Sequence, residues 1–220
     1  MPPALLAGVD EAGKGPVLGS MFIAGFATDE RGVETLKRLG VRDSKLLAPK
    51  RREELAARID PLGKVHVVEL SAARIDELRK RTTMNSLLVE AYAEVLRALK
   101  PGKAWLDAPD VKPERFAERV GAACGLRPPP EIVAEHRADA TYPVVSAASI
   151  IAKVRRDRSV RALEARLGFP IGSGYPSDPA TVAALPRVLK EAPGEVRHSW
   201  ETVGRLKNAP LSDFASGGRR

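Results

Sequence analysis

The sequence predicts an α/β protein in which helices flank a mixed β-sheet. Short apolar segments alternate along the chain with longer segments whose apolar residues recur at helical spacing. The first two apolar segments are joined by a glycine-rich turn, which predicts an antiparallel hairpin before the alternation begins. With 220 residues, 44% of them hydrophobic, the chain is long enough for one domain with its own core. This order of elements indicates a sheet covered by helices.

Strands are expected at five places. Residues 5–9 form a short apolar segment that ends in two acids, and residues 18–27 return antiparallel to it. The third strand is the valine-rich segment 64–70. The fourth covers residues 104–107 and is ended by Pro109, and the fifth covers residues 131–136.

Helices are expected between and after these strands. Apolar residues at helical spacing predict them at residues 49–59, 71–80, 84–99, 113–124 and 143–167. Ser71 is a candidate N-cap, and Gly125 fits the end of the fourth of these helices. Asp178 caps a further helix, which Pro186 is expected to interrupt, and residues 197–207 form the last one.

The composition limits the classes of protein to be considered. A net charge of +8 favours a polyanionic partner such as nucleic acid. The single cysteine, Cys124, excludes a disulfide framework and a cysteine-based zinc site within one chain. The longest apolar segment is interrupted by polar residues, and the N-terminus lacks the features of a signal peptide, so a cytoplasmic protein is expected. No motif of a serine or cysteine nucleophile is present.

Acidic residues follow three of the predicted strands. Asp10 and Glu11 end the first, Asp107 ends the fourth, and Asp139 lies just past the fifth. Sites in open α/β sheets form at the carboxyl ends of strands, where four carboxylates would repel one another unless a cation joined them. Mg²⁺ prefers such oxygen ligands, and two ions about 4 Å apart can activate water for phosphodiester hydrolysis. The alternative is that each acid only caps a helix or faces solvent.

Neighbouring residues on a regular strand point to opposite faces of the sheet. Asp10 and Glu11 are therefore expected to share one site only if the first strand ends between them. The glycine-rich turn that follows, Gly13-Lys14-Gly15, would permit this.

The turn itself resembles two nucleotide-binding motifs without matching either. Gly8 to Lys14 fits G-x-x-x-x-G-K, but Gly15 stands where a P-loop needs Ser or Thr, and Gly19 comes too late for a dinucleotide fingerprint. What remains is a loop whose backbone can approach a ligand closely, or a plain hairpin turn.

Further polar residues are candidates for contacts with phosphate or base. Ser146, Ser149, Lys153 and Arg156 share one face of the helix at 143–167, which becomes strongly basic beyond Lys153. This face either lines phosphates or is an ordinary solvated surface. Ser44 and Lys45 could hold a phosphate or form a helix-entry turn. Tyr175, in a glycine-rich loop, could stack on a base or sugar, or pack the loop onto the core.

Several segments resemble the sequence motifs of the ribonuclease HII family, in order and with similar spacing from about residue 5 to residue 200. They are Gly8-Val9-Asp10-Glu11-Ala12-Gly13-Lys14-Gly15-Pro16-Val17-Leu18-Gly19, Asp43-Ser44-Lys45-Leu46, Leu106-Asp107, Ala138-Asp139-Ala140-Thr141-Tyr142-Pro143-Val144-Val145-Ser146-Ala147-Ala148-Ser149-Ile150 and Gly174-Tyr175-Pro176-Ser177-Asp178-Pro179. The last resembles the archaeal form. The long segments are highly specific, whereas the shortest are not.

The resemblance implies a ribonuclease H-like fold with a five-stranded mixed sheet. The expected organisation is a catalytic domain over residues 1–195 and a C-terminal helical extension and tail over residues 196–220. It implies hydrolysis of RNA in RNA–DNA hybrids, and at ribonucleotides embedded in DNA, with Mg²⁺ or Mn²⁺, leaving 5′-phosphate and 3′-hydroxyl ends. A monomer is expected. The tail lacks features that would support binding to a sliding clamp.

The resemblance also implies roles for individual residues. The metal-binding catalytic acids would be Asp10, Glu11, Asp107 and Asp139. The turn Gly13-Lys14-Gly15 would read the ribose 2′-hydroxyl, and Tyr175 would sense the RNA–DNA junction. The family usually has Arg where Lys14 stands, an exchange that matters only if this side chain grips phosphate. The related ribonuclease HIII carries an extra N-terminal domain, for which only four residues precede the first strand here.

Two other functions remain open from the residues alone. A DNA nuclease or integrase on the same fold would share the acids but lack a reader of the 2′-hydroxyl. A non-catalytic nucleic-acid-binding protein would need only the basic charge, and clustered carboxylates would weaken its hold on phosphate.

Overall fold

The computed structural model describes residues 5–41 and 47–208 and contains one five-stranded sheet. The strand order is β3-β2-β1-β4-β5, with antiparallel pairing of β1 with β2 and of β2 with β3, and parallel pairing of β1 with β4 and of β4 with β5. The predicted hairpin and the mixed sheet are therefore confirmed. The strands are β1 (Leu6–Ala12), β2 (Met21–Thr28), β3 (Lys64–Leu70), β4 (Lys103–Asp107) and β5 (Glu131–Glu135).

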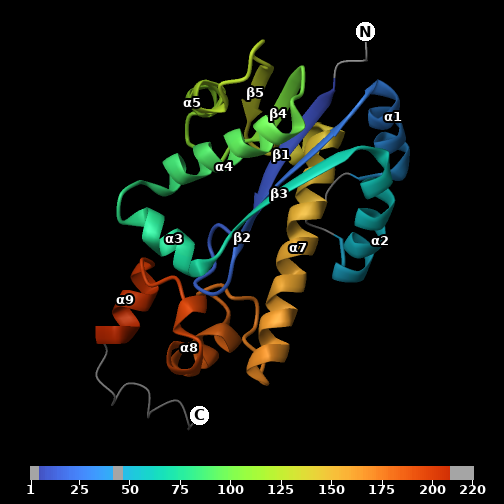
Figure 1. Cartoon of the computed structure of the whole chain (residues 1–220). Coiled ribbons are helices and arrows are strands. Elements are labelled where there is room, and N and C mark those ends of the chain that lie inside the picture. The colour runs from blue at the N-terminus through green and yellow to red at the C-terminus, as the bar shows by residue number, and fades with distance from the viewer. Residues whose placement is uncertain (1–4, 42–46, 209–220) are drawn as a thin grey trace.

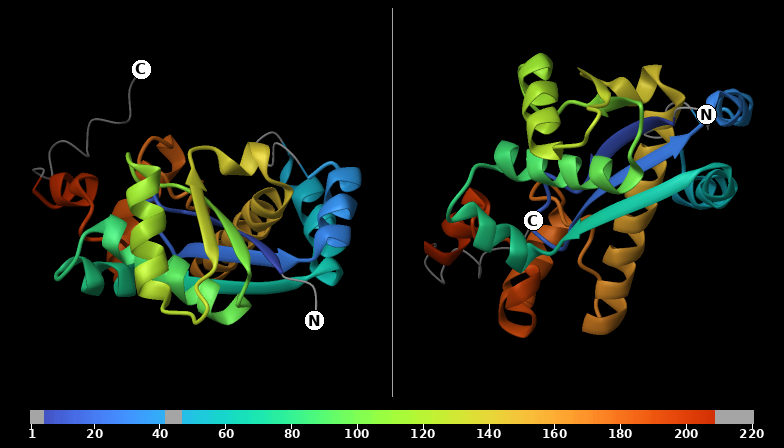
Figure 2. Two further views of the ribbon diagram at one scale, coloured as in Figure 1. Left: turned by 90° about the horizontal axis from the view of Figure 1, so that it is seen from above. Right: turned by 45° about the horizontal axis from the view of Figure 1, so that its top comes forward.

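Helices cover both faces of the sheet (Figures 1 and 2). The long helix α7 crosses one face with α1 and α2 beside it, and α4 and α5 cover the other face. Helices α8 and α9 lie at the end of the sheet where α7 finishes. The helices are α1 (Glu30–Leu39), α2 (Pro49–Ile59), α3 (Ala72–Arg79), α4 (Met84–Leu99), α5 (Pro113–Cys124), α6 (Ala138–Thr141), α7 (Pro143–Leu167), α8 (Pro179–Glu191) and α9 (Glu201–Asn208).

The sheet separates two apolar clusters, and a third lies under the C-terminal helices. Helix α7 approaches β1 closely because Gly8 has no side chain. A Cβ added to Gly8 would lie 2.2 Å from the backbone carbon of Val144. This contact sets the start of α7 against the strand that carries Asp10 and Glu11, so the polar face of the helix follows the acids.

Four predicted helices have the predicted bounds, namely α2, α4, α5 and α7. Helix α1 was not predicted, although Asp29 caps it by accepting the amide of Gly32 at 2.8 Å. The prediction that Pro186 interrupts its helix was wrong, because α8 continues through it. Pro186 lies on the exposed side, where water can satisfy the carbonyl that loses its partner.

The C-terminal segment is part of the packed structure well before the last helix. That helix begins at Glu201, not at residue 197. Val196 is buried and pairs with Leu18 in an isolated β-bridge, and the buried Arg197 donates a backbone hydrogen bond to Val17. The boundary predicted between residues 195 and 196 therefore does not coincide with a break in packing.

The structure also bears on the single cysteine and on membrane-spanning segments. Cys124 is a free, buried cysteine. Within residues 5–41 and 47–208, none of the helices combines the length and the apolar character that crossing a membrane requires.

Candidate active site

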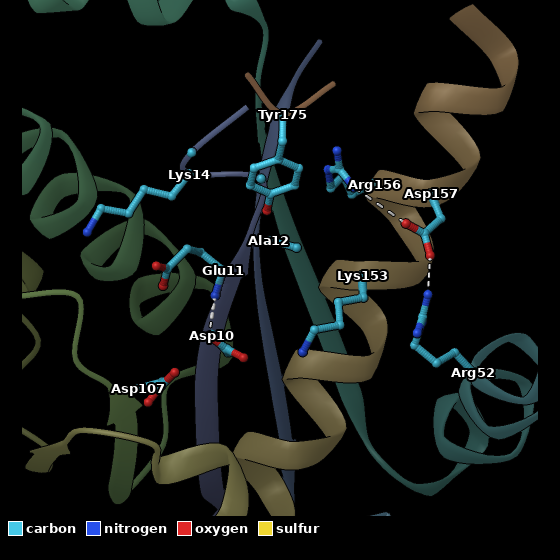
Figure 3. A pocket seen from close by; sticks show the side chains of 12 residues that line it. Asp10, Glu11, Ala12, Lys14, Arg52, Asp107, Lys153, Arg156, Asp157 and Tyr175 are labelled. Carbon is cyan, nitrogen blue, oxygen red and sulfur yellow. Dashed lines mark hydrogen bonds and ion pairs between the residues drawn. The ribbon is translucent and has the colours of Figure 1, made fainter. Parts of the chain in front are cut away.

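Acidic side chains gather where β4 ends beside the longer strand β1. The last paired residues of the two strands are Val9 and Leu106, so Asp10 and Asp107 come next at the same level. Beyond this point, no strand among the described residues pairs with β1 on that edge. Asp10, Glu11 and Asp107 line one cavity of about 430 Å³ there (Figure 3).

Asp10 and Glu11 share this cavity although β1 continues through both of them. The expectation that the strand must end between them was wrong, because they pair in regular register with Ala24 and Ile23. Their side chains do reach toward different helices. Glu11 accepts a hydrogen bond from Tyr92 on α4, whereas Asp10 interacts with Ser149 on α7. Both can face one cavity because the missing strand neighbour leaves the edge of β1 open.

The two later acids are connected through the start of α6. A carboxylate oxygen of Asp107 accepts the backbone amide of Ala138 at 2.9 Å, and Asp139 is the next residue. Asp139 is 6% exposed and is not among the residues that line the cavity. The fold therefore brings Asp139 next to Asp107 through the chain, while three of the four predicted acids surround the cavity directly.

The charges of these acids are held close together in a poorly solvated place. Burial, followed by the like charges of Glu11 and Asp107, raises the pKa of Asp10 well above its ordinary value. Burial also raises the pKa of Glu11, against the hydrogen bond from Tyr92. Such carboxylates repel one another when ionised, and a cation between them would remove the repulsion.

Tyr92 is a site residue that the sequence analysis missed. Its side chain is fully buried, packs edge-on against Phe116, and its hydroxyl reaches both Glu11 and the backbone oxygen of Asp107, the latter at 3.1 Å. Burial and the nearby acids raise the pKa of Tyr92 well above its usual range, so the hydroxyl keeps its proton and donates. Its position on an apolar helical face gave no signal beyond core packing.

The glycine turn forms the next part of the cavity wall. Gly13 has a φ of 90°, a conformation that side chains rarely adopt, and a Cβ there would lie 3.0 Å from the oxygen of Ser20. Gly15 is exposed and lines the cavity. The Lys14 ammonium donates to the carbonyl of Pro109 at 3.2 Å, so this side chain crosses toward the loop after β4.

Tyr175 lies against the glycine turn at the cavity and beside Arg156 (Figure 3). The Arg156 guanidinium is 5.1 Å from the centre of the Tyr175 ring and donates to the carbonyl of Ser173 in the same loop. The tyrosine remains 38% exposed. Arg156 therefore supports the loop that presents an accessible aromatic ring.

The basic residues of helix α7 point to two different places. Lys153 and Arg156 line the cavity, and Lys153 extends toward Asp10 (Figure 3). Arg158 and Arg161 instead form ion pairs with Glu53 on α2, and Arg155 is exposed. Lys153 and Arg156 therefore face the cavity, whereas Arg155, Arg158 and Arg161 lie on the solvated side of the helix, and the phosphate contact stays a prediction.

Ser146 does not reach the cavity. It is 1% exposed, and its hydroxyl donates to the backbone oxygen of Asp139 and lies 3.3 Å from that of Tyr142. Ser146 as a direct substrate contact was therefore wrong, since it holds the turn that carries Asp139. Ser44 and Lys45 lie outside the described residues.

Arg52 is a second residue that the sequence analysis did not select. It lines the cavity from α2 and donates to Asp157 on α7 at 2.7 Å. Asp157 also lies 3.7 Å from Arg156. The charge of Asp157 thus joins two cavity-lining arginines from different helices.

The chemistry of these donors fits divalent metal ions, although each carboxylate is now held by protein groups. Among the described residues, no three His, Cys, Asp or Glu side chains form a ready-made metal cluster. Asp10 accepts the amide of Glu11 at 2.7 Å, Glu11 accepts the Tyr92 hydroxyl, and Asp107 accepts the amide of Ala138. Oxygen-only donors that face one cavity and raise the pKa of a central carboxyl suit a hard cation such as Mg²⁺.

Comparison with known proteins identifies the family. A model of the Ribonuclease HII family matches residues 7–203. The chain belongs to the ribonuclease HII family. It is 52% identical over 207 residues to the ribonuclease HII of Methanothrix thermoacetophila, covering 92% of this chain and 97% of that protein. With the ribonuclease HII of Archaeoglobus fulgidus it shares 44% over 210 residues, covering 94% and 99%.

Several solved structures share this fold. The Archaeoglobus fulgidus enzyme, solved in a complex with PCNA, matches with a TM-score of 0.85 at 44% identity. The match covers 95% of this chain and 100% of that chain. Ribonuclease H2 of Pyrococcus horikoshii matches with a TM-score of 0.85 at 40% identity, covering 93% and 97%. Bst-RNase HIII in complex with Mn²⁺ shares the fold with a TM-score of 0.79 at 18% identity, covering 93% of this chain and 70% of that chain.

Family membership defines the activity. The protein is an endoribonuclease with ribonuclease H activity, which hydrolyses the RNA strand of RNA–DNA hybrids.

Proposed function

We propose that Asp10, Glu11, Asp107 and Asp139 are the catalytic acids and hold the divalent ions. The observation that carries this proposal is the meeting of Asp10, Glu11 and Asp107 at one cavity beyond the end of β4, with Asp139 joined to Asp107 through the amide of Ala138. Bound there, Mg²⁺ or Mn²⁺ supplies an activated water and stabilises the leaving oxygen of the phosphodiester. The Mn²⁺ in the Bst-RNase HIII complex supports Mn²⁺ as an alternative to Mg²⁺.

The protein groups have their own parts in this reaction. Tyr92 orients Glu11 by donating to its carboxylate, and Ser146 holds the carbonyl of Asp139. Lys153, which lines the cavity beside Asp10, offers a positive charge to the phosphate of the substrate. The products are a 5′-phosphate and a 3′-hydroxyl.

The glycine turn and Tyr175 are the proposed readers of the sugar. Gly13, Lys14 and Gly15 line the cavity next to the acids, and Gly15 presents exposed backbone to it. Backbone groups at this place can recognise the ribose 2′-hydroxyl, the feature that distinguishes RNA from DNA. Tyr175, whose ring lies against Gly15, would pack against the neighbouring deoxyribose. This arrangement supports cleavage at single ribonucleotides embedded in DNA as well as in hybrids.

The experiment that tests the proposal compares wild type and Asp107→Asn. Asparagine keeps an oxygen for the amide of Ala138 but loses the charge that holds a cation, so hybrid affinity should persist while turnover falls at least about a hundredfold. Cleavage of labelled RNA–DNA hybrid is measured with Mg²⁺, with Mn²⁺ and without metal. Glu131→Gln, an exposed acid on β5, is the control and should cleave at the wild-type rate. Turnover of Asp107→Asn within a few-fold of wild type would remove Asp107 from the site.

The remaining predictions concern organisation and surroundings. We propose that the protein acts as a monomer in the cytoplasm. A sliding clamp is a candidate partner because the Archaeoglobus fulgidus enzyme was solved with PCNA. The tail from residue 210, on which our prediction about the clamp depended, lies outside the described residues.

Ser44 and Lys45 stay predicted phosphate contacts. The packing of Val196 and Arg197 favours a catalytic unit that extends past residue 195.

A further inference from the structure

Arg197 is the largest fully buried side chain among the described residues, and it carries a charge. Its Nε donates to the carbonyl of Gly19 at 3.0 Å and its Nη1 to the carbonyl of Lys14 at 3.1 Å. Its Nη2 is buried and has no hydrogen-bond partner in the part of the chain that the structure describes. Burial, followed by the charge of Arg156, lowers the pKa of Arg197 to about 10, so it remains protonated at neutral pH.

A buried charge whose hydrogen bonds go to neutral carbonyls is costly for the folded state. Core packing alone does not account for it, since an apolar side chain of similar size would fill the space without that cost. The two carbonyls that it binds lie at the beginning and the end of the segment from Lys14 to Gly19. Arg197 therefore ties together the two ends of the segment Lys14–Gly19, which begins within the glycine turn that lines the cavity.

Trp200 makes a parallel contact with the next carbonyl of the turn. Its indole Nε1 donates to the carbonyl of Gly15 at 3.2 Å, and its ring lies 5.0 Å from the Arg197 guanidinium. The segment that carries both residues is fixed to α3, because Asp76 accepts the amides of His198 and Ser199 at 2.7 and 2.9 Å. The support for the glycine turn is thus itself held by the fold.

Because the peptide bond is planar, the contact of Arg197 with the Lys14 carbonyl also fixes the direction of the Gly15 N–H. In a trans peptide the C=O and the following N–H point to opposite sides. Because Arg197 holds the carbonyl of Lys14, the N–H of Gly15 points away from Arg197. Gly15 lines the cavity, and Pro16, the next residue, has no N–H to offer. The direction of one amide, that of Gly15, is therefore set from behind the turn.

We propose that Arg197, together with Trp200, is a positioning residue that orients the Gly15 amide and so sets the preference of this enzyme for ribose over deoxyribose. This inference rests on the proposed function of the glycine turn as the reader of the 2′-hydroxyl. Neither residue touches the substrate. Arg197 acts through the Lys14–Gly15 peptide, whose carbonyl it binds, and Trp200 acts through the Gly15–Pro16 peptide on the other side of the same residue.

Two conservative variants test the proposal. Trp200→Phe keeps an aromatic ring over Arg197 and loses only the donor to Gly15, and Arg197→Lys keeps the charge but cannot hold both carbonyls. The control is Val203→Ala, which removes apolar contacts from the same buried cluster but none of the hydrogen bonds that Arg197 and Trp200 donate to the carbonyls of Lys14, Gly15 and Gly19. Thermal unfolding identifies a temperature at which all three variants are folded.

The main measurement is the ratio of affinities for two duplexes, one with a single embedded ribonucleotide and one wholly of DNA, in the presence of EDTA. We expect the ratio to fall roughly tenfold in Trp200→Phe and in Arg197→Lys, because a charge-assisted or indole hydrogen bond no longer fixes the peptide. The affinity of each variant for the DNA duplex should equal that of wild type. The affinity ratio of the control Val203→Ala should also be unchanged. Loss of stability without any change in the ratio would overturn the proposal.

A second readout does not depend on the substrate. The amide of Gly15, observed by NMR in protein labelled with ¹⁵N-glycine, should shift and exchange with solvent faster in both variants and not in Val203→Ala. An unchanged Gly15 amide would refute the positioning role even if cleavage were reduced. If wild type itself failed to distinguish the two duplexes, the proposed reader function would fail, while the NMR result would still decide whether Arg197 positions the turn.

Discussion

Gly15 lies against the ring of Tyr175: a Cβ added to Gly15 would come within 3.2 Å of Cε1 of that ring. The reason why Gly15 must be glycine is therefore this contact and the open access to its backbone. A positive φ occurs at Gly13 and not at Gly15, so the backbone conformation does not itself require glycine at position 15.

Substitution of Gly15 should damage sugar reading in proportion to the size of the new side chain. Gly15→Ala displaces the Tyr175 ring by a few tenths of an ångström and should lower kcat/KM at a lone ribonucleotide several-fold. Gly15→Val should abolish most of this cleavage, since the branched side chain also covers the backbone. The control is Gly194→Ala, where an added Cβ meets nothing within 4 Å. Unimpaired cleavage by folded Gly15→Val would contradict the role of the turn.

Tyr175 should matter most at the junction between RNA and DNA. The ring can pack on a deoxyribose, whereas a ribose would bring an unpaired hydroxyl against it. Loss of one stacking contact is worth roughly 1–3 kcal/mol, so Tyr175→Ala should lower kcat/KM at a lone ribonucleotide about tenfold more than within a long RNA tract. Tyr175→Phe should be intermediate. Val182→Ala, an exposed apolar residue on α8, is the control. Equal losses on both substrates would make Tyr175 a general anchor.

Tyr92→Phe isolates the hydroxyl that donates to Glu11. The ring and its contact with Phe116 remain, so the free energy of unfolding should fall by only about 1 kcal/mol. Cleavage should slow roughly tenfold and need more Mg²⁺, because Glu11 is no longer oriented. Tyr142→Phe is a matched control, since its hydroxyl binds Glu135, which does not line the cavity. Equal activity of both variants would leave Tyr92 with a packing role alone.

Asp10→Asn should stabilise the metal-free protein while it removes activity. Burial and the charges of Glu11 and Asp107 raise the pKa of Asp10 in the folded state above its unfolded value. Ionised Asp10 therefore costs stability, and this cost grows as the pH rises from the unfolded pKa to the folded one. In EDTA at neutral pH, we expect the Tm of Asp10→Asn to exceed that of wild type by at least roughly 2 °C.

The control for this comparison is Asp60→Asn, an exposed acid, whose Tm should not change. Addition of Mg²⁺ should raise the Tm of wild type more than that of Asp10→Asn, because only wild type keeps the full set of ligands. A lower Tm for Asp10→Asn in EDTA would show that the carboxylate of Asp10 is stabilised by its protein partners.

The sequence by itself determined the elements and the candidate chemistry. Periodicity placed α2, α4, α5 and α7 with the correct bounds, because the apolar face of an amphipathic helix recurs every three to four residues whatever it packs against. The position of Asp10, Glu11 and Asp107 after apolar strands indicated the acidic end of the sheet. The resemblance to ribonuclease HII then supplied the activity, which family membership confirmed.

Only the tertiary structure decided which of these residues face one another. Ser146 and Lys153 share a helical face in the sequence, yet Ser146 turns to the backbone of Asp139 while Lys153 lines the cavity. Tyr92 reads as core, and Arg197 lies 183 residues from Lys14, whose carbonyl it binds. Local periodicity reports only whether a side chain is turned inward. The partner that it meets there depends on contacts between distant segments, and these exist only once the sheet and its helices have packed.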